Sequence, residues 1–148
     1  MNPPEAARAG NVQLSAGHLP VLTADEASSL ARRALLIDTR IRPNYIGGPS
    51  APGEARRGHI PGAVSVPAPA NLNADGRFLP AAELAALYGA AGLNMQEEVG
   101  IYCGAGVSAA HAVAALATLG ITAPMYVGSW SAYSADPARP AVTGDLPG

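Results

Sequence analysis

The stretch Val99-Gly100-Ile101-Tyr102-Cys103-Gly104-Ala105-Gly106-Val107-Ser108-Ala109 decides the fold of this chain. It begins as a short apolar run, passes through a loop of small residues and continues into an alanine-rich helical pattern. That succession predicts a buried strand that ends facing the N-terminus of a helix. Cys103, the only cysteine of the chain, lies at the junction between the two.

The position of Cys103 allows two interpretations. Backbone N–H groups of the loop and the helix dipole stabilise negative charge, so they should lower the pKa of the thiol and favour a nucleophilic thiolate. A lone cysteine is more commonly a small buried hydrophobic residue. Both glycines and the helix start follow immediately after the thiol, and this favours the reactive interpretation.

Short apolar runs and helical patterns alternate on both sides of this stretch. A capping box from Thr23 to Glu26 opens the first helical pattern, whereas the Gly/Pro-rich stretch 41–58 predicts no regular element. The alternation predicts an α/β fold with a mainly parallel sheet of about five strands flanked by helices. We expect strands at 35–37, 63–66, 99–102 and 125–127, and helices at 24–33, 81–91 and 108–119.

Length and composition indicate one domain. The 148 residues suffice for a proper core, with 1–20 as a tail or interdomain-type linker and 21–148 as the domain. A net charge of −2 with nine arginines and no lysine gives no basic field, so nucleic acid is not an expected partner. The sequence shows no secretion signal, membrane span or metal-ligand spacing, and we expect a cytoplasmic protein without a cofactor.

Several ordered motifs resemble one enzyme family over about residues 20–144. They are Asp38-Thr39-Arg40, Gly58-His59-Ile60-Pro61-Gly62-Ala63, Asp75-Gly76-Arg77-Phe78, the Cys103 loop and Gly128-Ser129-Trp130-Ser131. Together they are similar to the rhodanese sulfurtransferases, and more narrowly to the C-terminal half of the two-domain thiosulfate and 3-mercaptopyruvate sulfurtransferases. The resemblance implies a rhodanese-like fold in which residues 21–148 form the catalytic domain.

The family resemblance also implies a reaction. Cys103 would take a sulfane sulfur from thiosulfate or 3-mercaptopyruvate, become a persulfide, and pass the sulfur to cyanide or another thiophilic acceptor. The outer sulfur of a persulfide is anionic, and a ring of amides can hold it without cations. Ser108 is a candidate helix N-cap and also a candidate hydroxyl donor to the persulfide. The expected cradle consists of Gly104, Ala105, Gly106, Val107, Ser108 and Ala109.

The loop residues separate this chain from other enzymes with a cysteine loop. Phosphatases and arsenate reductases need an arginine about six residues after the thiol to hold an oxyanion, and here Ala109 stands at that position. The loop is nearer the mercaptopyruvate type than the thiosulfate type. It departs from that type at Ala105, where the family has a serine. Asn44 and the neighbourhood of Pro52 occupy the places of the family's substrate-binding arginines.

Other polar residues near the motifs carry weaker signals. Arg40 could reach the mouth of the site or form a structural ion pair with Asp38, and Arg57 is either solvated or binds an anion. His59 is interpreted as a structural residue of a turn, and Trp130 first as a core anchor and second as a pocket wall.

The resemblance covers only half of a two-domain enzyme, so an N-terminal rhodanese-like domain or a second copy is a possible partner. The alternative function is therefore a sulfur-carrier or protein-binding module, with little or no activity of its own, that needs a missing partner domain.

Overall fold

The computed structural model describes residues 10–49, 52, 55–94 and 96–148. The first nine residues of the expected tail, and most neighbours of Pro52, lie outside the described residues. The elements are α1 (Ala24–Arg33), β1 (Leu35–Asp38), α2 (Arg42–Ile46), β2 (Val64–Ser65), the 3-10 helix η1 (Ala68–Asn71), α3 (Ala81–Ala90), β3 (Val99–Tyr102), α4 (Val107–Ala117) and α5 (Ser129–Ala135).

The three strands form a parallel sheet in the order β2-β1-β3. β1 lies at its centre, where Ile37 pairs with both Val64 and Ile101. Side chains alternate between the two faces of a strand, so each face can carry its own core. Leu35 and Ile37 enter one core and Leu36 enters the other.

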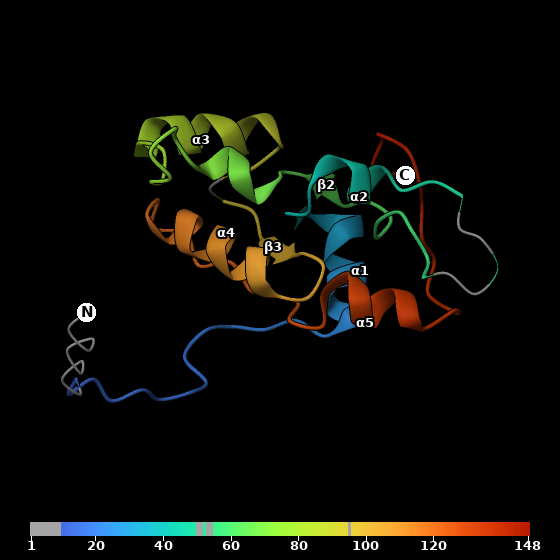
Figure 1. Ribbon diagram of the computed structural model, residues 1–148, viewed down its shortest axis with the longest axis horizontal. Coiled ribbons are helices and arrows are strands. Elements are labelled where there is room, and N and C mark those ends of the chain that lie inside the picture. The colour runs from blue at the N-terminus through green and yellow to red at the C-terminus, as the bar shows by residue number, and fades with distance from the viewer. Residues whose placement is uncertain (1–9, 50–51, 53–54, 95) are drawn as a thin grey trace, which may run out of the picture.

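Helices cover both faces of the sheet (Figure 1). Residues of α3 and α4 complete one core, and residues of α1 and α5 complete the other. Cys103 belongs to the core of α3 and α4, whereas Tyr102 belongs to that of α1 and α5. The predicted α/β class and parallel sheet are confirmed, and Tyr102 points away from the thiol as alternation requires.

The outer part of the sheet is smaller than the sequence predicts. The expected strand 125–127 is reduced to a parallel bridge between Met125 and Ile101, and Val21 joins Met125 by a second bridge. Two prolines explain why these pairings stay short. Pro124 accepts a backbone hydrogen bond from Ile101 and Pro20 accepts one from Met125, but neither proline has an N–H to donate in return. The described residues therefore hold three strands and four isolated bridges, two of which lie on this side of the sheet, so the expected count of five strands is not confirmed.

The predicted helices are present with small shifts, and two further α-helices were missed. The predicted capping box of α1 is confirmed, and β3 has the predicted bounds. The expectation that 41–58 holds no element is wrong, because α2 forms there with Pro43 in its first turn, where a proline fits. α5 was missed because its serines and aromatic residues are weak helix formers.

A buried polar cluster fixes the chain after β1. Arg40 donates from Nε to both carboxylate oxygens of Asp38 at 3.0 Å, and from Nη2 to the Gly58 carbonyl at 2.6 Å. His59 is fully buried, stacks on Tyr45, and its ring nitrogens lie 2.9 and 3.2 Å from the backbone oxygens of Tyr45 and Leu146. The structural interpretation of His59 and the ion pair of Arg40 are confirmed.

Gly58 is expected to be a position where an added methyl group is costly. Its φ is +107°, and a Cβ would overlap the carbonyl oxygen of Val142. Gly76 has a φ of +74° with open space around it, so it serves as a matched control. Gly58→Ala should lower the free energy of unfolding by about 2–4 kcal/mol, and Gly76→Ala by about 1 kcal/mol. Urea denaturation measures both, and equal losses would contradict the packing described at Gly58.

Candidate active site

Cys103 lies directly after β3, at the carboxyl edge of the sheet, and is 1% exposed. In parallel sheets flanked by helices, ligands bind at this edge. The Gly106 N–H donates to Cys103 Sγ at 3.0 Å. Gly106 has a φ of +91°, which an L side chain rarely adopts, and this left-handed turn directs its N–H back toward the sulfur.

The start of α5 holds the Cys103 loop through backbone hydrogen bonds. The Trp130 N–H donates to the Cys103 carbonyl at 2.8 Å, and the Ser131 N–H donates to the Gly104 carbonyl at 2.9 Å. Ser129 Oγ accepts from the Cys103 N–H at 3.1 Å and lies 3.7 Å from Sγ. Ser129 has a φ of +52°, the only positive φ among the described non-glycine residues. The left-handed backbone conformation of Ser129 thus places its hydroxyl next to the sulfur of Cys103.

The electrostatic balance at Cys103 favours the thiolate. Burial alone raises the pKa of the thiol, because a charged sulfur loses its hydration. Hydrogen bonds from the Ser108 hydroxyl, the Ala109 N–H, the Ser129 hydroxyl and the Ala105 N–H outweigh burial, so the pKa of Cys103 is lowered. The net direction is the one the sequence predicts, and several donors cause it.

Ser108 acts on the sulfur and not as a helix cap. The expected N-cap role is wrong, because α4 begins one residue earlier and Gly106 occupies the N-cap position. The Ser108 hydroxyl lies 3.2 Å from Thr39 Oγ1, which can donate to it and so leave the Ser108 proton for the sulfur, and Thr39 Oγ1 also lies 3.3 Å from the Tyr102 carbonyl oxygen. Thr39 follows β1, so side chains from two strand ends meet beside the thiol.

A hollow of about 620 Å³, which we call the Cys103 pocket, opens above the thiol. Its wall is mainly apolar and includes Ile41, Pro69, Leu72 and Val107. Val107 is 83% exposed and Ile41 is 53% exposed, so the rim offers bare apolar surface to solvent.

The two arginines considered for substrate binding lie in different surroundings. Arg40 lines the Cys103 pocket, is 8% exposed, and its guanidinium is committed to Asp38. Its carbon Cζ also lies 4.8 Å from the centre of the Trp130 ring. Arg57 is exposed and lines an adjoining groove with Trp130. Trp130 therefore serves both as an anchor in the core and as a wall of that groove.

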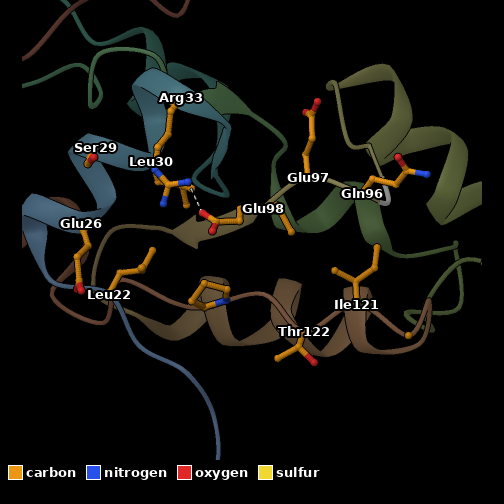
Figure 2. A pocket seen from close by; sticks show the side chains of 13 residues that line it. Leu22, Glu26, Ser29, Leu30, Arg33, Gln96, Glu97, Glu98, Ile121 and Thr122 are labelled. Carbon is orange, nitrogen blue, oxygen red and sulfur yellow. Dashed lines mark ion pairs between the residues drawn. The ribbon is translucent and has the colours of Figure 1, made fainter.

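Another hollow, of about 670 Å³, lies at the opposite end of β3 (Figure 2). The ion pair between Arg33 and Glu98 lies in it, and the Glu26 carboxylate there accepts the capping-box bonds of Thr23. No residue of the Cys103 loop lines it. Its described lining residues include no thiol and no histidine, so we place the candidate site at Cys103.

Neither Ser129 nor Thr39 was predicted to belong to this site. Both lie in the motifs Gly128-Ser129-Trp130-Ser131 and Asp38-Thr39-Arg40, but hydrophobic periodicity carries no information on which hydroxyl reaches a distant thiol. Ser129 is 26 residues from Cys103 and approaches it only because the chain returns along β3 at Met125 and Tyr126.

Within residues 10–49, 52, 55–94 and 96–148, no group of three or more His, Cys, Asp or Glu side chains is placed to hold a metal ion. Nor does any helix in the described ranges combine the length and apolar character that crossing a membrane requires.

Comparison with known proteins defines the class to which this fold and cysteine loop belong. The rhodanese-like domain family matches residues 23–136, from the N-cap of α1 to the residue after α5. The chain therefore belongs to the rhodanese-like domain family.

Curated relatives carry sulfurtransferase names. The chain is 46% identical over 127 residues to a Mycobacterium tuberculosis protein named "Putative thiosulfate sulfurtransferase SseB", covering 86% of this chain and 44% of that protein. It is 42% identical over 113 residues to the "Probable 3-mercaptopyruvate sulfurtransferase" of Pseudomonas aeruginosa, covering 74% and 39%. The chain thus spans less than half the length of these relatives.

Solved structures share the fold. The crystal structure of a "Probable Thiosulfate Sulfurtransferase" superposes with a TM-score of 0.61 at 32% identity, covering 82% of this chain and 46% of that one. Wild-type EanB superposes with a TM-score of 0.75 at 25% identity, covering 84% and 31%. A variant of EanB has been solved as a cysteine persulfide with ergothioneine.

Removal of the Ser108 hydroxyl should raise the pKa of Cys103, because that hydrogen bond stabilises the thiolate. The rate of alkylation by iodoacetamide follows the thiolate fraction. Its pH midpoint should therefore lie below that of a free thiol in the wild type and shift upward in Ser108→Ala.

Ser28→Ala, on α1, is the control, since its hydroxyl bonds to the Ala24 carbonyl and to Tyr133. An unchanged midpoint in Ser108→Ala, or an equal shift in the control, would contradict the role of Ser108.

Proposed function

We propose that this chain is a sulfurtransferase that carries a sulfane sulfur on Cys103. The donor is thiosulfate or 3-mercaptopyruvate, and the acceptor is cyanide or another thiophilic nucleophile. The observation that carries the proposal is the ring of N–H and hydroxyl donors around a buried thiol whose pKa is lowered. The names of the relatives and the persulfide captured in EanB support the same chemistry.

Sulfur uptake follows from the environment of Cys103. With thiosulfate, the thiolate attacks the outer sulfur, a new S–S bond forms, and the bond to the sulfonate breaks as sulfite leaves with the electron pair. The negative charge then moves to the outer sulfur of the persulfide. The N–H groups of Ala105, Gly106 and Ala109 act on the thiol and can follow that charge without a cation.

Sulfur release is the reverse in form. An acceptor such as cyanide attacks the outer sulfur, the S–S bond breaks, and its electron pair returns to Cys103 as the thiolate. The hydroxyls of Ser108 and Ser129 stabilise this leaving thiolate. The cycle is complete with one cysteine, and the chain contains only one.

The donor preference rests on what stands next to the thiol. Gly104 and Ala105 follow Cys103, so the loop itself carries no cation for a sulfonate. This favours 3-mercaptopyruvate, although Ala105 lacks the hydroxyl of the serine that mercaptopyruvate-type loops have at this position. Thiosulfate is supported by the name of the SseB relative.

A carrier or binding module is the second candidate, and two observations favour it. The chain spans 44% and 39% of the two relatives, and Ile41 and Val107 expose apolar surface at the mouth of the Cys103 pocket. A preceding rhodanese-like domain or a second copy that covers this rim would exclude water from the persulfide. In this account the isolated chain accepts sulfur but turns over slowly.

Cys103→Ser should abolish both sulfur uptake and turnover, because no second thiol is present to replace it. Intact-mass spectra after incubation with each donor should show the gain of one sulfur atom in the wild type alone. Thiocyanate production from cyanide measures turnover in the same samples.

The two signals separate the two candidates. Sulfur gain with turnover indicates a self-sufficient sulfurtransferase, and sulfur gain without turnover indicates the carrier module. Absence of both with either donor would contradict the proposed function of this chain.

A further inference from the structure

The Cys103 pocket has no uncompensated arginine or lysine to hold an anion. Of the described residues that line it, Arg40 is the only arginine, and it is paired with Asp38, while the chain has no lysine. Thiosulfate and 3-mercaptopyruvate are both anions. An anionic group placed against an apolar wall needs a hydrogen-bond donor in place of the water it loses.

His111 lines the Cys103 pocket and is half-buried. It lies three residues after Ser108 on α4, so the two side chains share one face of the helix. Side chains of a helix lean toward its N-terminus, so the imidazole ring of His111 leans toward the turn that holds Ser108. Because Ser108 donates to the sulfur, this orientation directs the ring toward the end of the pocket that contains the thiol.

Phe78 holds the imidazole ring of His111 in place. The two ring centroids are 4.9 Å apart and the ring planes are tilted by 46°, which is a favourable arrangement for two aromatic rings. Phe78 is itself fixed by an antiparallel bridge to Leu72, another residue of the pocket wall. Packing therefore fixes where the imidazole lies.

The Nδ1 atom of His111 is closed off from solvent and has no hydrogen-bond partner among the described residues. A proton on Nδ1 would be a buried donor without an acceptor, which is costly. The neutral ring therefore carries its proton on Nε2, which is the nitrogen left to face the pocket. His111 thus presents an N–H donor at the wall.

The other polar side chains of the wall are already engaged or hydrated. Thr39 and Ser108 lie within hydrogen-bond distance of each other, and Ser108 also donates to the sulfur. Asn44, on α2, is exposed, so water competes for its amide. His111 remains as the side chain that can bind an oxygen atom of the substrate.

We propose that His111 is a substrate-binding residue, whose Nε2–H donates a hydrogen bond to an anionic oxygen of the sulfur donor in the Cys103 pocket. This inference rests on the sulfur transfer proposed above and names a residue that selects the donor. The oxygen belongs to the sulfonate of thiosulfate or to the carboxylate of 3-mercaptopyruvate. The hydrogen bond holds the donor while the thiolate attacks its sulfur.

Two alkylating reagents test this contact apart from turnover. Iodoacetate carries a carboxylate and iodoacetamide a neutral amide, and both lose iodide to the same Cys103 thiolate. The ratio of their rate constants cancels the thiolate fraction, so it reports how the pocket receives an anion. His111→Phe keeps an aromatic ring against Phe78 and removes the donor. It should lower the iodoacetate-to-iodoacetamide ratio about three- to tenfold, as expected for one lost hydrogen bond.

Two further variants separate the hydrogen bond from packing. His111→Gln should keep most of the ratio, because its side-chain amide retains an N–H donor. His18→Phe, in the exposed segment before α1, is the matched control and should leave the ratio unchanged. An unchanged ratio in His111→Phe, or an equal loss in His111→Gln or His18→Phe, would overturn the role of His111.

Sulfur uptake from thiosulfate, followed by intact mass, distinguishes this proposal from the proposed function. His111→Phe should raise the thiosulfate concentration that gives half-maximal uptake about three- to tenfold, for the same reason. Sulfur gain with an unchanged alkylation ratio would overturn the role of His111 alone. The expected change of ratio in a chain that never gains sulfur would sustain the anion contact and overturn the proposed function.

Discussion

The arrangement around Cys103 lowers the pKa of a thiol that is buried. Burial raises the pKa of Cys103, and hydrogen-bond donors from three places lower it: the left-handed turn at Gly106, the first turn of α4 and the start of α5. Each donor needs its own backbone feature, such as the positive φ of Ser129. The alternation of β3 places Cys103 in one core and Tyr102 in the other, so the thiol faces α4 and its donors.

The Asp38–Arg40 pair supports this arrangement from the neighbouring strand end. Both residues are buried, and removing one partner of such a pair typically costs about 3–5 kcal/mol because a charge is left unpaired. The pair also reaches the Gly58 carbonyl and the Trp130 ring. It therefore links β1, the segment that enters β2, and α5, all of which border the cysteine loop.

The sequence predicted the strand, the loop and the thiol of this site. It did not predict the side-chain contacts from distant segments or the short helices, and each of these misses has a physical reason. The apolar run 99–102 and the glycines after it predict a strand, a tight loop and a thiol at its end, and these local signals are confirmed. The roles of Ser129 and Thr39 depend on contacts between distant segments, which no local pattern encodes. α2 and α5 are short helices in stretches rich in turn-forming residues, where packing overrides propensity. Prolines 20 and 124 limit the expected strand 125–127 to two isolated bridges at Met125. The substrate-binding roles considered for Arg40 and Arg57 stay predictions, and so do the domain bounds at residue 20.

Following a labelled sulfur atom tests the central claim most directly, namely that Cys103 itself carries the transferred sulfur. The protein would be incubated with thiosulfate labelled at its outer sulfur and, separately, with sulfur-labelled 3-mercaptopyruvate, then digested and mapped, and a second portion chased with cyanide. The account predicts label on the peptide that contains Cys103, at no more than one atom per chain, and its transfer to thiocyanate in the chase. Labelled thiocyanate formed without any protein-bound label, or label that cyanide cannot remove from that peptide, would contradict it.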